Sequence, residues 1–327
     1  MKQVIYNKIG HPAEVLFIKE VQQRALKSGE ARVSILATPI HPSNLLKISG
    51  QYGISPQLPE TPGTEGVGRV TEVAADVETL TVGQMVFLAG YSTWQEEVTG
   101  PAASFIPLPE GADIQQLSML MINPITAFRL LNAFADLNEG DWVVQNAANS
   151  AVGGYLIQLA KKKGIKTINI VRRESASKAL IDLGADKVIV DGPNLTEQIT
   201  QSVAGESVSL AIDAVGGESF SRMVASLSYG GTIVCYGLMS MHPPVLPSMA
   251  VIFNEITVRG FWLAKWFEHA SSADKQKTFA EVIGLVASGD LNAKISQTFS
   301  LDQIKEAVTA AGESGRDGKV LLLPNTP

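Results

Sequence analysis

Cysteine is almost absent from this chain of 327 residues, since Cys235 is the only one. Histidine is also rare, with four residues in the sequence. A lone thiol cannot form a disulfide within the chain or supply a zinc site with several thiolates, and its isolation is typical of a reducing compartment. Residues 1–16 have neither the apolar centre of a secretory signal nor the arginine-rich character of other targeting segments. The sequence therefore predicts a cytoplasmic protein.

Long apolar runs and large clusters of positive charge are also missing. No stretch approaches the roughly 18 consecutive apolar residues that a membrane-spanning helix needs. The formal net charge is −6, and no cluster of Lys and Arg is longer than Lys161–Lys163. An acidic chain of this kind attracts phosphate backbones weakly. We therefore expect neither a membrane nor a nucleic acid as partner.

The pattern of apolar and turn-forming residues changes near residue 113. Before it, short β runs such as 30–40, 66–74 and 84–90 are separated by Gly, Pro and Asn turns. After it, apolar residues recur at helical spacing, and strands then alternate with helices, which is typical of a parallel α/β sheet. We expect six strands in this part, at 141–147, 166–173, 187–191, 210–216, 230–237 and 256–262.

The last segment predicts a strand, an amphipathic helix and a final strand, which we expect to return to the first module. The predicted fold class is therefore α/β, with a Rossmann doubly wound parallel sheet inserted in a β-rich domain. The Rossmann domain is placed at residues 114–290, and the β-rich domain at residues 1–113 and 291–327.

Residues 145–154, QNAANSAVGG, form a degenerate dinucleotide fingerprint. When the third glycine of G-x-G-x-x-G is placed at Gly153, Ala148 and Ser150 occupy the other two positions. Ala148 is small enough for the turn, and Ser150 lets the backbone approach a pyrophosphate while adding a hydroxyl. The strand, turn, helix and second strand around the motif favour a dinucleotide site over an ordinary strand-turn-helix.

Arg172 and Arg173 stand at the end of the second strand, where an acidic residue usually binds the ribose hydroxyls of NADH. A guanidinium forms charge-assisted bonds to a 2′-phosphate, which a carboxylate would repel. The sequence predicts NADPH as the cofactor. A solvated arginine pair at a strand end is the alternative.

No metal site is expected. Dehydrogenases of similar two-domain layout often bind zinc through Cys and His, but the first module has only His11 and His41, and Thr64 stands where a ligand histidine would be. His41, before Pro42, is interpreted as a turn or pocket residue. Without a metal, charge that develops on a substrate oxygen must be stabilised by hydrogen-bond donors.

The loop HPSNLLKISGQYGISP offers Ser43, Asn44 and Tyr52 as polar candidates on a segment bounded by Gly and Pro. Tyr52 is the only side-chain acid placed in this loop, since an ordinary phenol is protonated at neutral pH. The alternative is that Tyr52 only covers a core edge.

Five segments together resemble the zinc-free medium-chain dehydrogenase/reductases, and among them the trans-2-enoyl-thioester reductases. The segments are INPITAFRLL, QNAANSAVG, TINIVRR, GGTIVCYGLMS and VIFNEITVRGFWL. The similarity extends over nearly the whole chain, and QNAANSAVG with RGFWL is its specific part. It implies that the β-rich domain is a GroES-like catalytic domain.

The resemblance also implies roles for individual residues. Tyr52 matches the proton donor, and Asn44 and Trp262 are the candidate substrate contacts. The implied cofactor contacts are Asn123, Thr126, Asn149, Ser150, Ala151, Val152, Gly153, Arg172, Arg173, Tyr236, Gly237, Leu238, Met239, Phe261, Trp262, Leu263 and Lys319. Three residues depart from the family pattern: His41 replaces the usual Asn, Asn44 the usual Asp, and Glu174 a further basic residue.

The leading hypothesis is NADPH-dependent reduction of an activated C=C bond, with an enoyl thioester carried by coenzyme A or an acyl carrier protein as substrate. A quinone or α,β-unsaturated ketone reductase is the enzymatic alternative. An NADPH-binding structural or nucleic-acid-binding protein is the non-enzymatic one. Residues 256–262 would leave an apolar sheet edge exposed in a monomer, so we expect a homodimer.

Overall fold

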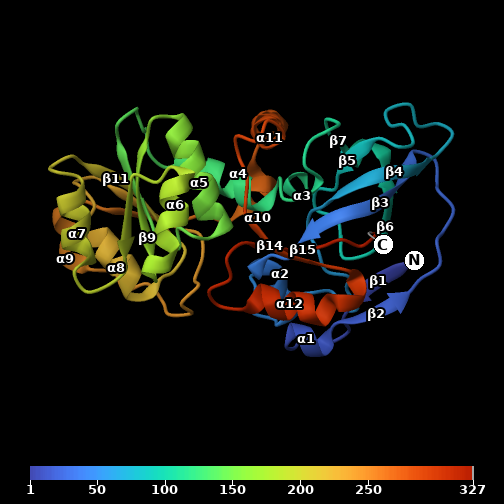
Figure 1. Cartoon of the computed structure of the whole chain (residues 1–327), viewed down its shortest axis with the longest axis horizontal. Coiled ribbons are helices and arrows are strands. Elements are labelled where there is room, and N and C mark those ends of the chain that lie inside the picture. Colours follow the sequence, from blue (N-terminus) through green and yellow to red (C-terminus); the bar gives the residue numbers. More distant parts are fainter. Residues whose placement is uncertain (326–327) are drawn as a thin grey trace. The chain divides into compact units, whose positions relative to one another are not determined.

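The computed structural model describes residues 1–325 and divides the chain into two compact units (Figure 1). The first unit comprises Met1–Ile122 and the residues from Ile283 onward, and the second comprises Asn123–Val282. No helix in the described range is long and apolar enough to cross a membrane.

The first unit is built on a sheet of seven strands in the order β14-β15-β3-β4-β5-β7, in which β6 pairs with β3. A separate antiparallel pair joins β1 (Lys2–Ile5) to β2 (Phe17–Glu20). The strands of the larger sheet are β3 (Glu30–Pro39), β4 (Val67–Val73), β5 (Met85–Phe87), β6 (Glu97–Pro101), β7 (Ile106–Pro107), β14 (Ile295–Phe299) and β15 (Lys319–Leu322).

Alternation of apolar residues explains the long strand β3. Ala31, Val33, Ile35 and Ala37 are buried at a period of two, which places them on one face of the pleated strand. Ala31, Val33 and Ile35 belong to a core shared with β4 and β5, whereas the residues between the four are partly exposed. This half-covered sheet is typical of an antiparallel module.

Short helices accompany this sheet, and α12 (Ile304–Gly312) is the longest that lies wholly in the first unit. Its Ile304, Ala307, Val308 and Ala311 recur at helical spacing and pack against β15. The others are α1 (Pro12–Val15), α2 (Pro42–Ile48), α3 (Ile114–Leu117) and the 3-10 turns η1 (Ala102–Ser104) and η3 (Leu301–Gln303).

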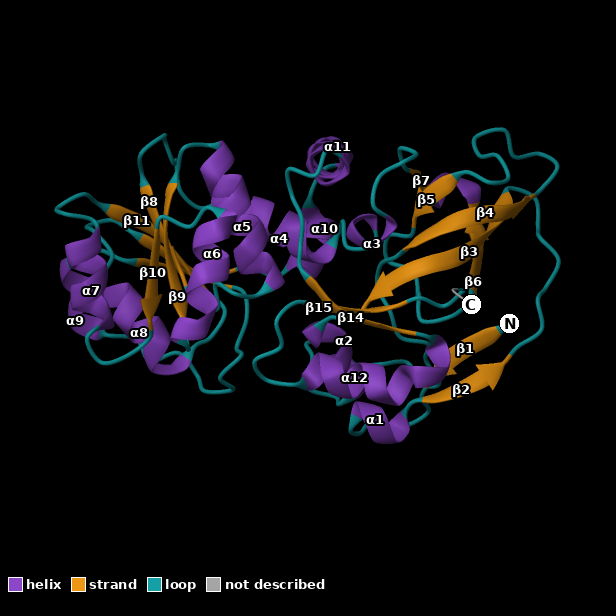
Figure 2. Cartoon of the chain, in the orientation of Figure 1, coloured by secondary structure: helices purple, strands orange, loops and turns teal. Residues whose placement is uncertain are grey.

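The second unit is a parallel sheet of six strands in the order β10-β9-β8-β11-β12-β13. Figure 2 shows helices on both of its faces. The two central strands are almost entirely buried, as expected for a sheet covered on both sides. The strands are β8 (Trp142–Gln145), β9 (Lys166–Val171), β10 (Lys187–Val190), β11 (Val208–Asp213), β12 (Thr232–Cys235) and β13 (Thr257–Gly260).

The helices that connect these strands include α5 (Ala151–Lys162), α6 (Ser177–Leu183) and α8 (Gly217–Ala225). The remaining helical elements are α4 (Ile122–Asn132), η2 (Glu174–Ala176), α7 (Leu195–Ser202), α9 (Ser248–Phe253), α10 (Leu263–His269) and α11 (Ser272–Ala287).

The predicted fold class is confirmed, including all six strands of the parallel sheet and the return of the last strand to the first module. β15 pairs with β3 of the first unit, so the second unit interrupts the first. The compact units divide after Ile122 and after Val282. The side chain of Gln116, just past the predicted first boundary, exchanges hydrogen bonds with the backbone of Ala293, which keeps α3 in the first unit.

Candidate functional site

The turn after β8 leads directly into the long helix α5. Ala147 adopts a left-handed conformation with φ of 47°, and the N–H of Ser150 donates to its carbonyl at 2.8 Å. Ser150 is the N-cap of α5, and its Oγ accepts a hydrogen bond from the N–H of Gly153 at 3.2 Å. The helix therefore begins at the carboxyl end of a central strand, where its first N–H groups and its dipole favour an anion.

Two glycines allow close backbone packing beside this turn. A Cβ at Gly153 would lie 2.4 Å from the carbonyl oxygen of Ala148, and one at Gly237 would lie 2.9 Å from that of Ala214. Both distances are shorter than real Cβ contacts. The fingerprint thus keeps the glycine that the close contact between the turn and the start of α5 requires, although its first two glycines are replaced.

Tyr236 follows β12 and reaches the same turn. Its side chain forms a hydrogen bond with Ser150, while its N–H donates to the carbonyl of Asp213 at 2.9 Å. Burial raises the pKa of the Tyr236 phenol, and the bond to Ser150 opposes that rise without cancelling it. Tyr236 therefore remains a neutral hydroxyl against the N-cap of α5.

Sequence reasoning missed a buried network between β8 and β11. The side-chain N–H of Asn146 donates to Asp213 Oδ1 at 2.6 Å, and the N–H of Gly216 donates to the same oxygen at 3.1 Å. The side-chain oxygen of Asn146 in turn accepts from the N–H of Ala214 at 2.8 Å. The network fixes the loop after β11. In the sequence, only the aspartate that ends the apolar segment LAID indicated this network.

The single cysteine lies beside this network. Burial raises the pKa of Cys235 to about 11, and Asp213 adds to the rise. A thiol in such surroundings stays protonated at neutral pH and is a poor nucleophile.

Arg172 and Arg173 lie immediately after β9, which pairs with β8 in parallel. Both side chains are exposed, and within residues 1–325 neither has a carboxylate in ion-pair contact. Glu174 is also exposed and begins η2. The two guanidinium groups are thus free for an anionic ligand.

The predicted cofactor residues of the second unit gather after the carboxyl ends of parallel strands. Ser150 follows β8, Arg172 follows β9, Tyr236 follows β12 and Phe261 follows β13. In a parallel sheet these ends share one edge, and ligands of doubly wound folds bind there. Leu238 and Met239 are exposed, Leu263 is buried at the start of α10, and Trp262 is its N-cap.

Asn123 and Thr126 lie on α4 and are both 7% exposed. Their predicted cofactor contacts would use side chains that are largely covered.

In the first unit, Tyr52 lies half-buried in the loop that follows α2. Asn44 is buried at the start of α2, and its Oδ1 accepts a hydrogen bond from the N–H of His41 at 2.9 Å. Asn44 thus has a capping role that the sequence analysis did not foresee. Its substrate contact, like the other site roles, stays a prediction.

A chain of ionisable side chains is buried in the same unit. His41 Nε2 lies 2.7 Å from Glu65 Oε1, and its Nδ1 lies 3.1 Å from Lys319 Nζ. The Glu65 carboxylate also accepts hydrogen bonds from the N–H groups of Met121 at 2.6 Å and Ile122 at 3.2 Å. These buried side chains connect the segments before α2, before β4, at the start of α4 and at the start of β15.

These donors do not fit a zinc ion. Both ring nitrogens of His41 are already engaged, and residues 1–325 contain no group of three or more His, Cys, Asp or Glu side chains that could hold a metal.

Two family models match separate parts of the chain. Residues 27–110 match the alcohol dehydrogenase GroES-like domain, and residues 151–288 match a model described as zinc-binding dehydrogenase.

Similar proteins and structures cover nearly the whole chain. The mitochondrial enoyl-[acyl-carrier-protein] reductase of Rattus norvegicus is 34% identical over 95% of this chain and 85% of its own length. The complex of Etr1p, a 2-enoyl thioester reductase from Candida tropicalis, with NADP and crotonyl-CoA has a TM-score of 0.90 at 27% identity and covers 98% of this chain and 99% of its own. A protein of Bacillus thuringiensis named for NADPH:quinone reductase activity has a TM-score of 0.90 at 31% identity, covering 98% of both chains.

Proposed function

We propose that this chain, which belongs to the medium-chain dehydrogenase/reductases and within them to the enoyl-[acyl-carrier-protein] reductase family, reduces the C=C bond of a trans-2-enoyl thioester with NADPH. One observation carries the choice of cofactor. The N-cap of α5 and the exposed arginine pair follow neighbouring strands of one parallel sheet, so a helix N-terminus and two guanidinium groups lie along the same edge.

The second unit is accordingly proposed as the cofactor-binding part. The first-turn N–H groups of α5, with Asn149 to Val152, would hold the pyrophosphate, and Arg172 and Arg173 would bind the 2′-phosphate. Gly153 and Gly237 fit this role because the backbone there leaves no room for a side chain. The first unit, with Tyr52, is proposed as the catalytic part.

When bound, NADPH supplies a hydride, which the β-carbon of the enoyl thioester accepts. The α-carbon then needs one proton, and we assign it to the Tyr52 hydroxyl, which regains a proton from solvent. The products are NADP⁺ and the saturated thioester. The contribution of the protein is to orient the two reactants and to place one acid beside the α-carbon.

A quinone reductase is the second candidate, and the Bacillus thuringiensis relative supports it. The experiment that separates the two follows NADPH oxidation with crotonyl-CoA, with a small quinone and with no acceptor. Turnover of crotonyl-CoA at a higher kcat/KM than the quinone supports the enoyl reductase. If only the quinone is reduced, the second candidate is supported. If the protein reduces none of the acceptors in a broad panel, both candidates are refuted.

We further propose a homodimer joined through β13. All four residues of this edge strand are exposed, and Met249, Ile252 and Phe253 on the preceding helix α9 are between 66% and 69% exposed. An unpaired strand next to exposed apolar side chains favours association.

The proposed location is the cytoplasm, on the ground of the single unpaired thiol. The curated relatives are mitochondrial by name. Fractionation of cells that produce the protein with a carboxyl-terminal tag distinguishes the two compartments.

A further inference from the structure

Arg129 of α4 carries a guanidinium group that has no acceptor in the described chain. The group lies over the indole ring of Trp266, 5.2 Å from the ring centroid, and this stacking restricts the plane of its five N–H donors. Its Nε is buried without a hydrogen-bond partner, and within residues 1–325 no carboxylate is in ion-pair contact with Arg129. Buried donors are usually paired, so this exception points to an acceptor outside the chain.

A cavity of about 290 Å³ lies beside this group, between α4, the end of α5 and α11. All the residues that line it belong to the second unit. Thr278 of α11 is one of them. It is 3% exposed, and its hydroxyl forms no hydrogen bond with any residue of the described range 1–325. An unpaired hydroxyl and an unpaired guanidinium therefore line the same cavity.

The lining carries three cations and two carboxylates, and thus one net positive charge. Of the carboxylates, Asp274 accepts a hydrogen bond from a serine hydroxyl at 2.8 Å, and Glu281 is exposed. Of the lysines, Lys163 donates to the side-chain oxygen of Asn132, whereas Lys277 has no partner within residues 1–325. The cations are therefore not neutralised by the carboxylates that share the cavity.

The dipoles of α4 and α5 account for part of this arrangement. Arg129 and Lys163 stand at the carboxyl ends of these helices, where positive side chains interact favourably with the dipole. This interaction explains why both residues are basic. It explains neither a buried N–H without an acceptor nor the unpaired hydroxyl of Thr278, which lies on another helix. A ligand that accepts hydrogen bonds explains both.

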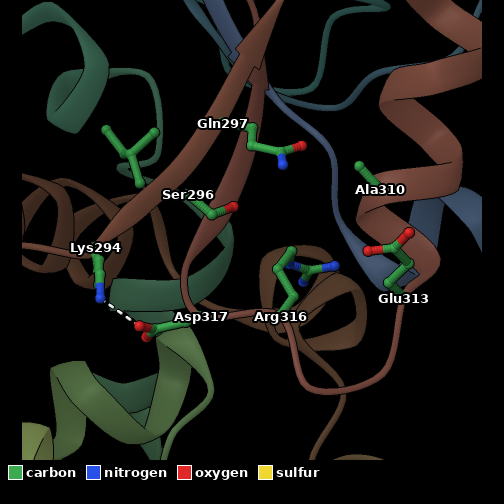
Figure 3. Close-up of a pocket in the computed structure, with 8 residues that line it drawn as sticks. Lys294, Ser296, Gln297, Ala310, Glu313, Arg316 and Asp317 are labelled. Atoms are coloured by element: carbon green, nitrogen blue, oxygen red, sulfur yellow. Dashed lines mark hydrogen bonds and ion pairs between the residues drawn. The ribbon is translucent and has the colours of Figure 1, made fainter.

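A second cavity, in the first unit, shows how an arginine is satisfied within the chain. Figure 3 shows Arg316 in this cavity of about 270 Å³, which is lined by β14, α12 and the loop before β15. Arg316 donates from Nε to the carbonyl oxygen of Gly318 at 2.7 Å and from a terminal nitrogen to that of Ala311. In the same view Lys294 and Asp317 are paired with each other. This second cavity therefore needs no anion.

We propose that the cavity between α4 and α11 binds a phosphate group, either free or as the monoester of a small molecule. The fork of Arg129 holds two of its oxygens, the Thr278 hydroxyl donates to a third, and the Lys277 ammonium neutralises remaining charge. A carboxylate has only two oxygens and a single charge, so it leaves part of these donors unused.

This site is distinct from the one proposed for NADPH. The cofactor pyrophosphate is placed at the N-cap of α5, whereas the cavity lies at the carboxyl end of the same helix. A helix of 12 residues separates the two ends by about 18 Å. The inference therefore does not depend on the proposed function, and its failure leaves that function standing.

Calorimetric titration of the full chain with inorganic phosphate at neutral pH tests the site. An excess of NADP⁺ is present, so that the edge proposed for the cofactor is filled. We expect one phosphate per chain with a Kd of about 1 mM or lower. Glycerol 3-phosphate distinguishes the two sources, since tighter binding of the ester supports a phosphorylated small molecule and weaker binding supports free phosphate. Acetate should bind at least about tenfold more weakly than either.

Two variants remove the donors one at a time. Arg129→Met keeps an unbranched side chain over Trp266 and removes the guanidinium, so it should weaken phosphate binding about 10- to 150-fold. Thr278→Val keeps the shape of the side chain and removes only the hydroxyl, so it should weaken binding about tenfold. The Tm of each variant without phosphate shows whether the fold is intact.

Two variants on the surface of α11 should act with opposite signs. Lys277→Gln removes a cation and should weaken phosphate binding about two- to fivefold, whereas Glu281→Gln removes a carboxylate and should tighten it by a similar factor. Lys178→Gln makes the same change on α6, away from the cavity, and should leave the Kd unchanged.

Three results would overturn the inference. The first is a wild-type chain that binds no phosphate saturably in the presence of NADP⁺, which would mean that water satisfies these donors. The second is unchanged phosphate binding in an Arg129→Met variant of wild-type Tm, which would place the bound phosphate elsewhere. The third is acetate that binds as tightly as phosphate, which would exclude a site specific for phosphate.

Discussion

Gly153 and Ala148 approach so closely that a Cβ on Gly153 would lie 2.4 Å from the carbonyl oxygen of Ala148. The next residue, Gly154, has no such neighbour, because its Cβ would lie 3.5 Å from the end of the Leu183 side chain. Of these two adjacent glycines in one helix, only Gly153 is required by packing.

Gly153→Ala should lower the free energy of unfolding by about 1–3 kcal/mol, because the turn at Ala148 and the first turn of α5 must separate to admit the methyl group. Gly154→Ala should raise it by up to about 1 kcal/mol, because alanine is the better helix former. Urea-induced unfolding followed by circular dichroism measures both. A loss of equal size in the two variants would contradict the packing argument.

Arg172→Ala together with Arg173→Ala should reduce the preference for NADPH over NADH. A charge-assisted bond to a phosphate contributes roughly 1.5–3 kcal/mol, which corresponds to about 10- to 150-fold in the affinity ratio. The neighbouring Glu174 makes the lower end of this range the expected value. Kd values for both cofactors give the ratio.

Lys178→Ala is the matched control, since Lys178 is an exposed cation of α6 that is paired with Asp182. It should leave the NADPH:NADH ratio unchanged. A double arginine variant with wild-type selectivity would mean that the 2′-phosphate binds elsewhere.

Tyr52→Phe should lower kcat with crotonyl-CoA by about 10²–10⁴-fold and leave the Kd of NADPH nearly unchanged, because the ring remains while the acid is lost. The same variant should lose much less activity with a quinone, whose reduced oxygen is protonated readily by water. Steady-state kinetics with both acceptors measures the contrast. A small loss with both would show that Tyr52 is only a wall of the pocket.

Val258→Lys should convert a dimer into single chains of 34.8 kDa, because it places a charge on the exposed edge strand β13. Val82→Lys makes the same chemical change at an exposed position of the first unit, where Val82 is 62% accessible against 43% for Val258. It should leave the mass unchanged. Light scattering at micromolar concentration measures both, and a wild-type chain with the mass of one copy would refute the proposed dimer.

The sequence predicted the parallel sheet well because its information is local. Apolar runs such as WVV in β8 and the alternation of strand and helix identify each element from neighbouring residues. The arginine pair was equally visible, since its place depends only on the end of β9. The contact between Gln116 and Ala293 was not visible in this way, because it joins distant segments.

The buried polar contacts were not predictable for the same reason. Lys319 and His41 are 278 residues apart in the chain. No periodic pattern in the sequence indicates that a lysine at the start of an apolar strand contacts a histidine just before a helix. Asn146 and Asp213 are likewise brought together only by the pairing of β8 with β11. The capping role of Asn44 was not predictable either, because it depends on the backbone position of His41 at the start of α2.

The pairing of β15 with β3 has a consequence for how the protein is made. A ribosome releases residues 123–282 before it has synthesised Lys319–Leu322, so the inserted unit can fold while the edge of β3 that receives β15 is still open. During that interval β3 lacks one of its neighbours and presents unpaired backbone groups to other nascent chains. The residues that close the sheet of the first unit are thus synthesised after the whole inserted unit, and slow synthesis of that unit would prolong the aggregation-prone period of the growing chain.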